Sequence, residues 1–450
     1  MERSAHSWEE RIAAIIEVLD PFEAEVGRQI AADTLPTRFK EPAAYSCLSR
    51  LYHETIVDLD KIVEAGGTQS AVNRRVFRKF SEKFAPRKTV ISAAEESAWL
   101  EPAHLFACFF QLRRAFNQIE RSVTGHAKPV QDLRGRIWES IFTRDMKRFQ
   151  LWMFQAVGRF PTLVLGPSGS GKELVSRAIG QSRFLSYDSG SALFSNETQP
   201  TFYPVNLSAL SPTILESELF GHVRGSFTGA HTDRKGLFET AGDSGCVFLD
   251  EIGDVGQDLQ VKLLRLLQSG EFQRIGESRT QSFGGKVIAA TNRDLGAEMK
   301  AGRFREDLFY RLCGDQVRTP SLHSILLDEP DDLERFVYFV CRNLFGESAS
   351  ATVAPEISES LRDQIPDGYG WPGNFRELEQ AIRNIVVTGR YEIGDPSEAP
   401  EITRLYQSAE IPLSDWVGLY ARRAREVHRT TRKAADILGV DPRTLQKHYN

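Results

Sequence analysis

The chain has 450 residues, a net charge of −5 and a hydrophobic fraction of 41%. Its length predicts about three domains, and its composition favours globular domains with apolar cores over disordered or fibrous chain. No apolar run approaches the roughly 18 residues that a membrane-spanning helix needs, so we expect no membrane segment. The first residues are acidic and polar, unlike a secretion signal, and we expect a cytoplasmic protein.

The five cysteines are scattered and form no C-x-x-C pair. This spacing is typical of isolated thiols in a reducing compartment, and it favours neither disulfides nor a zinc site.

Residues 1–127 are predicted to form a helical module, because apolar residues recur at helical spacing in two stretches, 12–19 and 105–119. The aromatic side chains Phe106, Phe109 and Phe110 could line a ligand pocket, but core packing is the favoured interpretation. We expect this module to regulate the rest of the chain.

A glycine-rich turn follows a short apolar strand within residues 163–176, and a helical pattern comes next. The turn has the G-x-x-x-x-G-K pattern of a phosphate-binding loop, whose backbone N–H groups and helix N-terminus hold phosphate oxygens. Glu173 stands where Ser or Thr commonly holds magnesium, and a glycine turn before an ordinary helix is the alternative. The candidate nucleotide-binding residues here are Gly166, Pro167, Ser168, Gly169, Ser170, Gly171, Lys172 and Glu173.

Glycines frame a Phe-Thr pair at residues 221–230. Because this composition suits neither a helix nor a strand interior, we expect a mobile hairpin tip that presents the Phe227 ring to a partner.

Two later apolar strands end in polar residues, one at Asp250 and Glu251 and the other at Thr291 and Asn292. Asp250 can hold magnesium and Glu251 can polarise an attacking water. The ends of parallel strands meet at one edge of a sheet, so Thr291 or Asn292 is expected near the γ-phosphate. An acidic end on an ordinary strand is the alternative.

Arg305 and Arg311 flank a helical piece, where cations can stabilise the charge of phosphoryl transfer. Further on, Asn374 can cap a helix whose first turn holds Arg376. Because the helix dipole disfavours a cation at a helix N-terminus, this position suggests that Arg376 interacts with something outside its own helix. Surface arginines in ion pairs are the alternative at these positions.

The last 40 residues, 411–450, hold eight Lys or Arg and four Asp or Glu, a net of +4 in an acidic chain. Two short helices around a glycine turn are predicted there, a helix-turn-helix pattern that favours DNA contact and a dimer. A helical pair used only for dimer contacts is the alternative. The candidate DNA-binding residues are Arg443, Thr444, Gln446, Lys447 and His448.

The motifs GPSGSGKE, ESELFGH, GSFTGA, CVFLDEIGD, AATNRD, FREDLFYRL and WPGNFREL occur in this order. Together they resemble the central domain of sigma-54-dependent transcription activators, the bacterial enhancer-binding proteins of the AAA+ ATPase class. The resemblance covers about residues 130–395, and the basic end resembles a Fis-type helix-turn-helix. It implies a multidomain protein with a helical N-terminal domain, an α/β AAA+ P-loop ATPase core with a helical lid, and a small all-α DNA-binding domain.

The resemblance also implies site residues. ATP and Mg²⁺ would be held by the phosphate loop and Asp250, with Glu251 activating water and Asn206 restraining Glu251. Thr291 and Asn292 would form one nucleotide sensor and Arg376 a second. Arg305 and Arg311 would act as arginine fingers on a neighbouring subunit. The sigma-54 contact is implied for Gly225, Phe227, Thr228 and Gly229.

Three departures from the family pattern stand out. Ser226 replaces the usual alanine, and the stretch after Arg311 lacks the usual proline-rich segment. An insert at about 187–201, rich in Ser, Gly, Asn and Asp, is predicted to be an exposed loop.

The sequence therefore predicts an ATP-dependent activator that binds upstream DNA, assembles from dimers into a hexameric ring and remodels sigma-54 RNA polymerase. The alternatives are a DNA-binding regulator that has lost this remodelling, and an AAA+ remodeller of other proteins. The predicted parts are 1–127 regulatory, 128–320 nucleotide-binding, 321–395 lid, 396–412 linker and 413–450 DNA-binding.

Overall fold

The computed structural model describes residues 21–32, 34–94, 101–195, 202–366 and 368–391, together with Ala435. The predicted linker, the helix-turn-helix with its five candidate DNA-binding residues, and the first predicted helical stretch lie outside these residues. In the part of the chain that is described, no helix combines the length and apolar character needed to cross a membrane.

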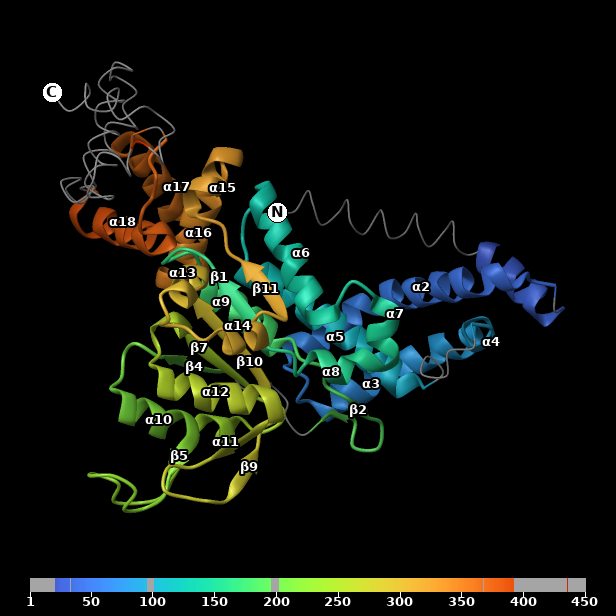
Figure 1. Ribbon diagram of the computed structural model, residues 1–450. Coiled ribbons are helices and arrows are strands. Elements are labelled where there is room, and N and C mark those ends of the chain that lie inside the picture. Colours follow the sequence, from blue (N-terminus) through green and yellow to red (C-terminus); the bar gives the residue numbers. More distant parts are fainter. Residues whose placement is uncertain are drawn as a thin grey trace. The chain divides into compact units, whose positions relative to one another are not determined.

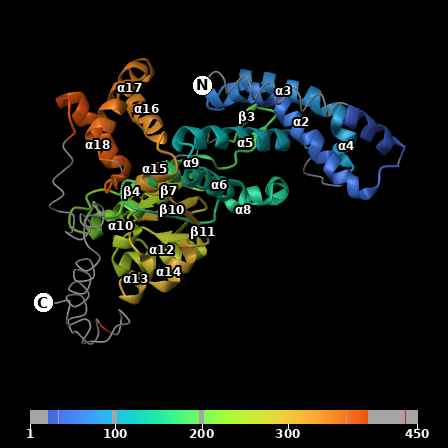
Figure 2. The same cartoon turned by 90° about the horizontal axis from the view of Figure 1, so that it is seen from above.

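Helices make up the described N-terminal region, as the apolar periodicity predicts. They are α2 Thr37–Glu64, α3 Ser70–Phe84, η1 Ala85–Arg87, α4 Lys88–Ser92 and α5 Pro102–Ser122. Helices α3, α4 and α5 contact α2, and they lie beside one another in two views (Figures 1 and 2). Phe106, Phe109 and Phe110 are at most 2% exposed in a shared apolar core, which confirms core packing for these rings.

The centre of the chain is an α/β core around one parallel sheet, and the α/β expectation is confirmed. Its strand order is β11-β1-β10-β7-β4, and every neighbouring pair is parallel. The strands are β1 Thr162–Leu165, β4 Phe202–Asn206, β7 Cys246–Asp250, β10 Lys286–Thr291 and β11 Asp315–Arg318. Since all five run in one direction, their carboxyl ends meet at the same edge.

Apolar side chains on alternate strand positions bury both faces of this sheet. Leu163, Val247 and Ala289 pack on one face in a core shared with α10, α11, α12 and α14. Their neighbours Val164 and Phe248 are also buried, and helix α9 (Lys172–Gln181) contacts β1, β4, β7 and β10. The helices on the first face are α10 Pro212–Phe220, α11 Leu237–Ala241, α12 Gln257–Ser269 and α14 Glu306–Leu312.

Smaller elements join these layers. Helix α6 spans Lys128–Phe142, and the shorter helical segments are α7 Met146–Arg148, the π-helical turn η3 Phe149–Met153, α8 Phe154–Val157, η4 Ile252–Asp254 and α13 Leu295–Lys300. Three antiparallel hairpins pair β2 Tyr187–Asp188 with β3 Leu193–Phe194, β5 Gly221–His222 with β6 Arg234–Lys235, and β8 Glu271–Gln273 with β9 Thr280–Ser282.

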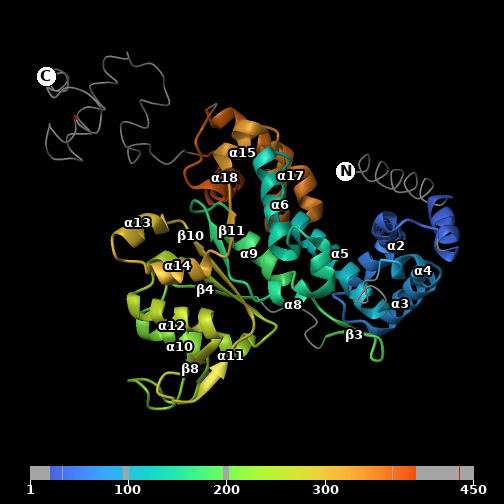
Figure 3. The ribbon, with the colours of Figure 1, turned by 45° about the vertical axis from the view of Figure 1, so that its right-hand side comes forward.

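Among the described residues up to 391, four helices follow the sheet. They are α15 Leu322–Asp328, α16 Asp332–Phe345, α17 Glu347–Gln364 and α18 Asn374–Thr388. Helix α15 contacts α6, and the two lie beside each other in Figure 3. The buried Asp332 carboxylate accepts hydrogen bonds from the backbone N–H groups of His126 and Ala127, directly before α6. The chain divides into two compact units, residues 1–359 with 367–382 and residues 360–366 with 383–450, so α17 and α18 each end in the second unit.

The prediction of an exposed loop at 187–201 was wrong for its described first part. Residues 187–194 form the β2–β3 hairpin, and Tyr187, Ala192 and Phe194 are at most 7% exposed in the core of the N-terminal helices. The Phe194 ring stacks on Phe106 as well as Phe110, and Tyr187 meets Phe77 and Phe106. Two large rings within a polar stretch thus attach the nucleotide-binding region to the N-terminal helices.

A second attachment holds the chain directly after α9, the helix that begins at Lys172. From α5, the Gln111 amide donates to the Ser182 carbonyl and the Arg114 guanidinium donates to the Arg183 carbonyl. Burial lowers the pKa of Arg114 to about 9. Because buried backbone carbonyls need hydrogen-bond donors, α5 supplies them to the two residues that directly follow α9.

Candidate functional site

The phosphate loop leaves the end of β1 and is held by the neighbouring strands. The Gly166 N–H donates to the Thr291 carbonyl at 3.4 Å, and a Cβ atom on Gly166 would overlap the Thr319 hydroxyl. That hydroxyl lies 2.6 Å from the Ser170 hydroxyl. Gly169 and Gly171 have φ angles of +73° and +85°, in the left-handed region that favours glycine. The loop therefore has the backbone that its glycines predict.

Lys172 points its amine back along the loop. It is 8% exposed, and its Nζ donates to the carbonyls of Gly166 and Pro167 at 3.2 Å each. Burial lowers the pKa of Lys172, while the nearby carboxylates of Glu251 and Asp250 oppose that shift. Neutral carbonyls are weaker hydrogen-bond acceptors than a charged phosphate, so the Lys172 amine can exchange them for phosphate oxygens.

Asp250 and Glu251 end β7 at the same edge of the sheet. Burial raises the pKa of Asp250, and its carboxylate accepts from the Glu251 N–H at 3.0 Å. Glu251 has a left-handed φ of +56°, unusual for a residue with a side chain, and its buried Oε2 atom has no hydrogen-bond partner among the described residues. A strained backbone and an unsatisfied buried carboxylate oxygen are typical of a residue that serves a ligand.

The other predicted residues of this edge occupy the ends of β4 and β10. Asn206 lies opposite Asp250 in the register of β4 and β7, and its side-chain oxygen accepts from the Ser208 N–H and hydroxyl. Within the described chain, no hydrogen bond joins Asn206 to Glu251. Thr291 is buried, whereas Asn292 beyond the strand is exposed.

Arg305 and Arg311 stand at the two ends of α14. Arg305 precedes the helix and pairs with Asp307, with its Nη2 and Nε atoms 2.7 Å and 3.0 Å from the carboxylate oxygens. This pairing raises the pKa of Arg305 and lowers that of Asp307. Arg311 is exposed in the last turn.

The Phe-Thr loop is a short tip closed at its base. The Gly225 N–H donates to the Ala230 carbonyl at 2.9 Å, and Thr228 at the tip is exposed. The Phe227 ring is half-buried and meets the His222 ring edge-on, with the centroids 5.0 Å apart. Whereas the sequence predicts a presented ring, the structure packs Phe227 against the base of its own loop.

Arg376 from the lid reaches the phosphate loop, with its Nη1 atom 3.3 Å from the Ser168 hydroxyl. Its side chain is exposed, and its positive charge acts to lower the pKa of both Lys172 and Asp250. The Asn374 side chain, expected as a helix cap, bonds to the Ser168 carbonyl and to the Leu322 N–H.

The structure adds three residues that the sequence analysis did not single out for these positions. Thr319 holds the phosphate loop, Asn374 bonds to its tip, and His222 supports Phe227 while its Nδ1 atom lies 2.7 Å from the Ser217 hydroxyl. Thr319 could have been found as a polar residue directly after a strand. Asn374 could have been recognised as a left-handed turn residue, because it follows Pro-Gly.

Residues 145–318 match the family model of the sigma-54 interaction domain. This central segment is therefore a sigma-54 interaction domain, and the resemblance seen in the motifs is confirmed for it. The phosphate loop, the Phe-Thr loop and both arginines of α14 fall inside the matched residues.

Similar curated proteins carry the name anaerobic nitric oxide reductase transcription regulator NorR. The protein from Salmonella heidelberg is 46% identical over 231 residues, which cover 51% of this chain and 41% of that protein. The one from Salmonella paratyphi C is 43% identical over 228 residues, with the same two coverages. The chain thus matches less than half the length of these curated relatives.

Among solved structures, NtrX from Brucella abortus is similar with a TM-score of 0.43 and 21% identity. The alignment covers 82% of this chain and 74% of NtrX.

Proposed function

We infer that this chain is an ATP-hydrolysing transcription activator that remodels sigma-54 RNA polymerase. The observation that carries this inference is the single sheet edge that gathers the phosphate loop, Lys172, Asp250 and Glu251 within a sigma-54 interaction domain. Lys172 lies close enough to the carboxylates of Asp250 and Glu251 for their charges to act on it, so a phosphate-binding cation and two acidic groups meet at one place, as phosphoryl transfer from a nucleotide requires.

ATP is the substrate in this proposal. The backbone N–H groups of residues 168–172 and the Lys172 amine would bind its phosphates, and Arg376 would approach from the lid. Glu251 would take a proton from the attacking water, since its buried Oε2 atom has no other partner among the described residues.

Magnesium fits the carboxylate at the end of β7. Mg²⁺ usually binds through one or two carboxylates together with substrate phosphates, and Asp250 is a half-buried carboxylate beside the loop. When bound there, the ion would neutralise charge on the phosphates.

In this proposal each nucleotide site receives its arginines from a neighbouring subunit. Arg305 directly precedes α14 and is partly exposed, and Arg311 is exposed in its last turn, so we infer that they complete the site of an adjacent subunit in a ring. The Phe227 loop would contact sigma-54, with the exposed Thr228 at its tip.

In this proposal the N-terminal helices regulate the nucleotide site, and the C-terminal residues direct the protein to DNA. The N-terminal helices are joined to the end of α9 and to the hairpin after it, a route by which they could control the nucleotide site. Upstream DNA binding is proposed for residues 413–450 on their sequence alone.

Three substitutions test the proposal with purified protein, Mg²⁺-ATP and a sigma-54 promoter. Lys172→Ala should reduce nucleotide binding, Glu251→Ala should retain binding and abolish turnover, and Thr228→Ala should hydrolyse ATP yet fail to open the promoter. Normal activation by Thr228→Ala would refute the assigned sigma-54 contact. Turnover without any promoter opening by the unaltered chain would favour the regulator that has lost remodelling.

A further inference from the structure

The tip of the phosphate loop is hydrogen-bonded to the lid through two successive carbonyls. The Ser168 carbonyl accepts from the Asn374 Nδ2 atom at 3.0 Å, and the Gly169 carbonyl accepts from the Phe375 N–H at 3.1 Å. In such a loop the N–H groups face the phosphates, so the carbonyls on the outside need other donors. Here the lid supplies them.

Asn374 is placed for this role by its backbone and its burial. It is 3% exposed and its φ is +52°, in the left-handed region where asparagine is one of the few tolerated residues with a side chain. The approach is close, because a Cβ atom on Gly169 would overlap the Gly373 carbonyl. A glycine is therefore required at position 169 for steric reasons as well as for its left-handed backbone.

The same amide also holds the first helix of the lid. Its Oδ1 atom accepts from the Leu322 N–H at 2.8 Å, at the first position of α15. That N–H has no carbonyl partner within its own helix, since the first four N–H groups of a helix lack one. One buried side chain thus connects the loop, the start of α15 and the start of α18.

We propose that Asn374 is a positioning residue of the nucleotide site, which fixes the tip of the phosphate loop and couples its shape to the lid. This inference rests on the proposed nucleotide binding but concerns a different residue from Arg376. A loop held in its binding conformation loses less freedom when it binds phosphate, so losing the hold weakens binding. By linkage, bound nucleotide must in turn strengthen the contacts of Asn374.

The substitution Asn374→Asp separates the two bonds of this amide. Aspartate keeps an oxygen to accept from Leu322 but has no N–H for the Ser168 carbonyl. Asn374→Gly removes both bonds, keeps the left-handed backbone and adds no charge. Asn343→Asp is the matched control, because it makes the same chemical change at an exposed position of α16.

The experiment uses the full chain with Mg²⁺ and a fluorescent ATP analogue, and it also records amide hydrogen exchange. Relative to Asn343→Asp, both Asn374 variants should bind the analogue about tenfold more weakly, as expected for the loss of about one hydrogen bond. In the nucleotide-free protein, amide exchange at 166–171 should be faster in both variants than in the control, whether or not loss of the buried bonds also lowers the melting temperature. A role confined to folding of the lid would lower the melting temperature without this local change.

Binding of the analogue by either Asn374 variant at the control's affinity would overturn the proposal. Failure of the unaltered chain to bind the analogue would instead refute nucleotide binding itself, so the two failures are distinguishable. If neither variant folds, the unaltered chain still decides: nucleotide should slow exchange of the Leu322 and Phe375 N–H groups, and unchanged exchange there would contradict the coupling.

Discussion

Phe110 of α5 and Phe194 of the β2–β3 hairpin stack with their ring centroids 3.9 Å apart and their planes inclined by 28°. The two residues are 84 positions apart in sequence, one in the N-terminal helices and one in the region between the phosphate-loop helix and β4. Both are at most 2% exposed. The N-terminal helices and this hairpin therefore share a core, so that neither can be removed without exposing apolar surface of the other.

Phe194→Ala should destabilise the protein by about 3–5 kcal/mol, because it leaves a large cavity among aromatic rings. Chemical unfolding followed by fluorescence measures this change. Phe116→Ala is the control on α5, since Phe116 is 44% exposed and its loss should cost less than about 1 kcal/mol. Equal effects of the two substitutions would show that the hairpin is not part of the core.

Asn73 supports the same attachment through a buried amide. Its Nδ2 atom donates to the Gly67 carbonyl at 2.9 Å and to the Ala192 carbonyl at 3.1 Å. Asn73→Ala should lower the free energy of unfolding by about 1–3 kcal/mol, because two buried carbonyls lose their donor. Asn117→Ala, which removes a half-buried amide 3.3 Å from Asp60, should have a smaller effect in the same unfolding assay.

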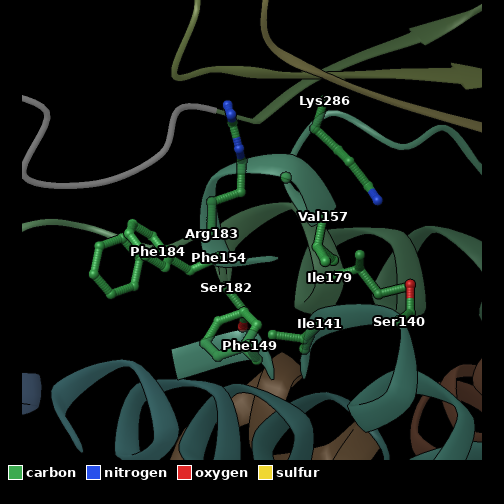
Figure 4. A pocket seen from close by; sticks show the side chains of 11 residues that line it. Ser140, Ile141, Phe149, Phe154, Val157, Ile179, Ser182, Arg183, Phe184 and Lys286 are labelled. Carbon is green, nitrogen blue, oxygen red and sulfur yellow. The ribbon is translucent and has the colours of Figure 1, made fainter. Parts of the chain in front are cut away.

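Lys286 predicts a pH dependence of stability. Burial lowers its pKa from 10.5 to about 8, and its amine donates to the Phe160 carbonyl at 2.6 Å beside a cavity of about 20 Å³ (Figure 4). Between about pH 8 and 10.5 the unfolded chain binds more protons at this residue than the folded chain, so its contribution to stability rises with pH. Below pH 8 the buried charge is unfavourable by up to about 3 kcal/mol.

The substitution Lys286→Met tests this sign. The increase in stability between pH 8 and 10.5, measured by denaturant unfolding, should be smaller in this variant than in the unaltered chain. Lys300→Met, at an exposed position of α13, should leave the increase unchanged. An increase of the same size in Lys286→Met and the unaltered chain would assign it to another group.

The arginines of α14 predict a dependence on protein concentration. If Arg305 and Arg311 act on a neighbouring subunit, ATP turnover per chain should climb as rings assemble, and Arg305→Ala or Arg311→Ala should reduce it by about 10³-fold or more. Steady-state assays over a dilution series measure this. The exposed Arg121 of α5 provides the control, Arg121→Ala. Turnover that is independent of concentration would contradict a shared site.

The phosphate loop and the strand ends could be predicted because their chemistry depends on local patterns. Gly169 and Gly171 need left-handed backbone, and Asp250 ends an apolar strand whose neighbours all run in parallel. Once the sheet is parallel, the meeting of these residues at one edge follows from geometry.

The hairpin and the lid contact could not be predicted in the same way. Tyr187 and Phe194 stand in a polar stretch whose composition favours a loop, and only long-range packing against α3 and α5 buries them. Asn374 could be recognised as a turn or cap residue from the preceding Pro-Gly pair. Its partners at Ser168 and Leu322 lie 206 and 52 positions away and appear only when the chain is folded.

The most direct test of the account is capture of sigma-54 by the full chain in the presence of Mg²⁺-ADP and aluminium fluoride, which mimics the transferring phosphate. The chain should retain sigma-54 on a gel-filtration column only with this mimic, and Thr228→Ala should release it while still binding nucleotide. If the unaltered chain binds the nucleotide mimic yet retains no sigma-54, the account of an ATP-driven sigma-54 activator is contradicted.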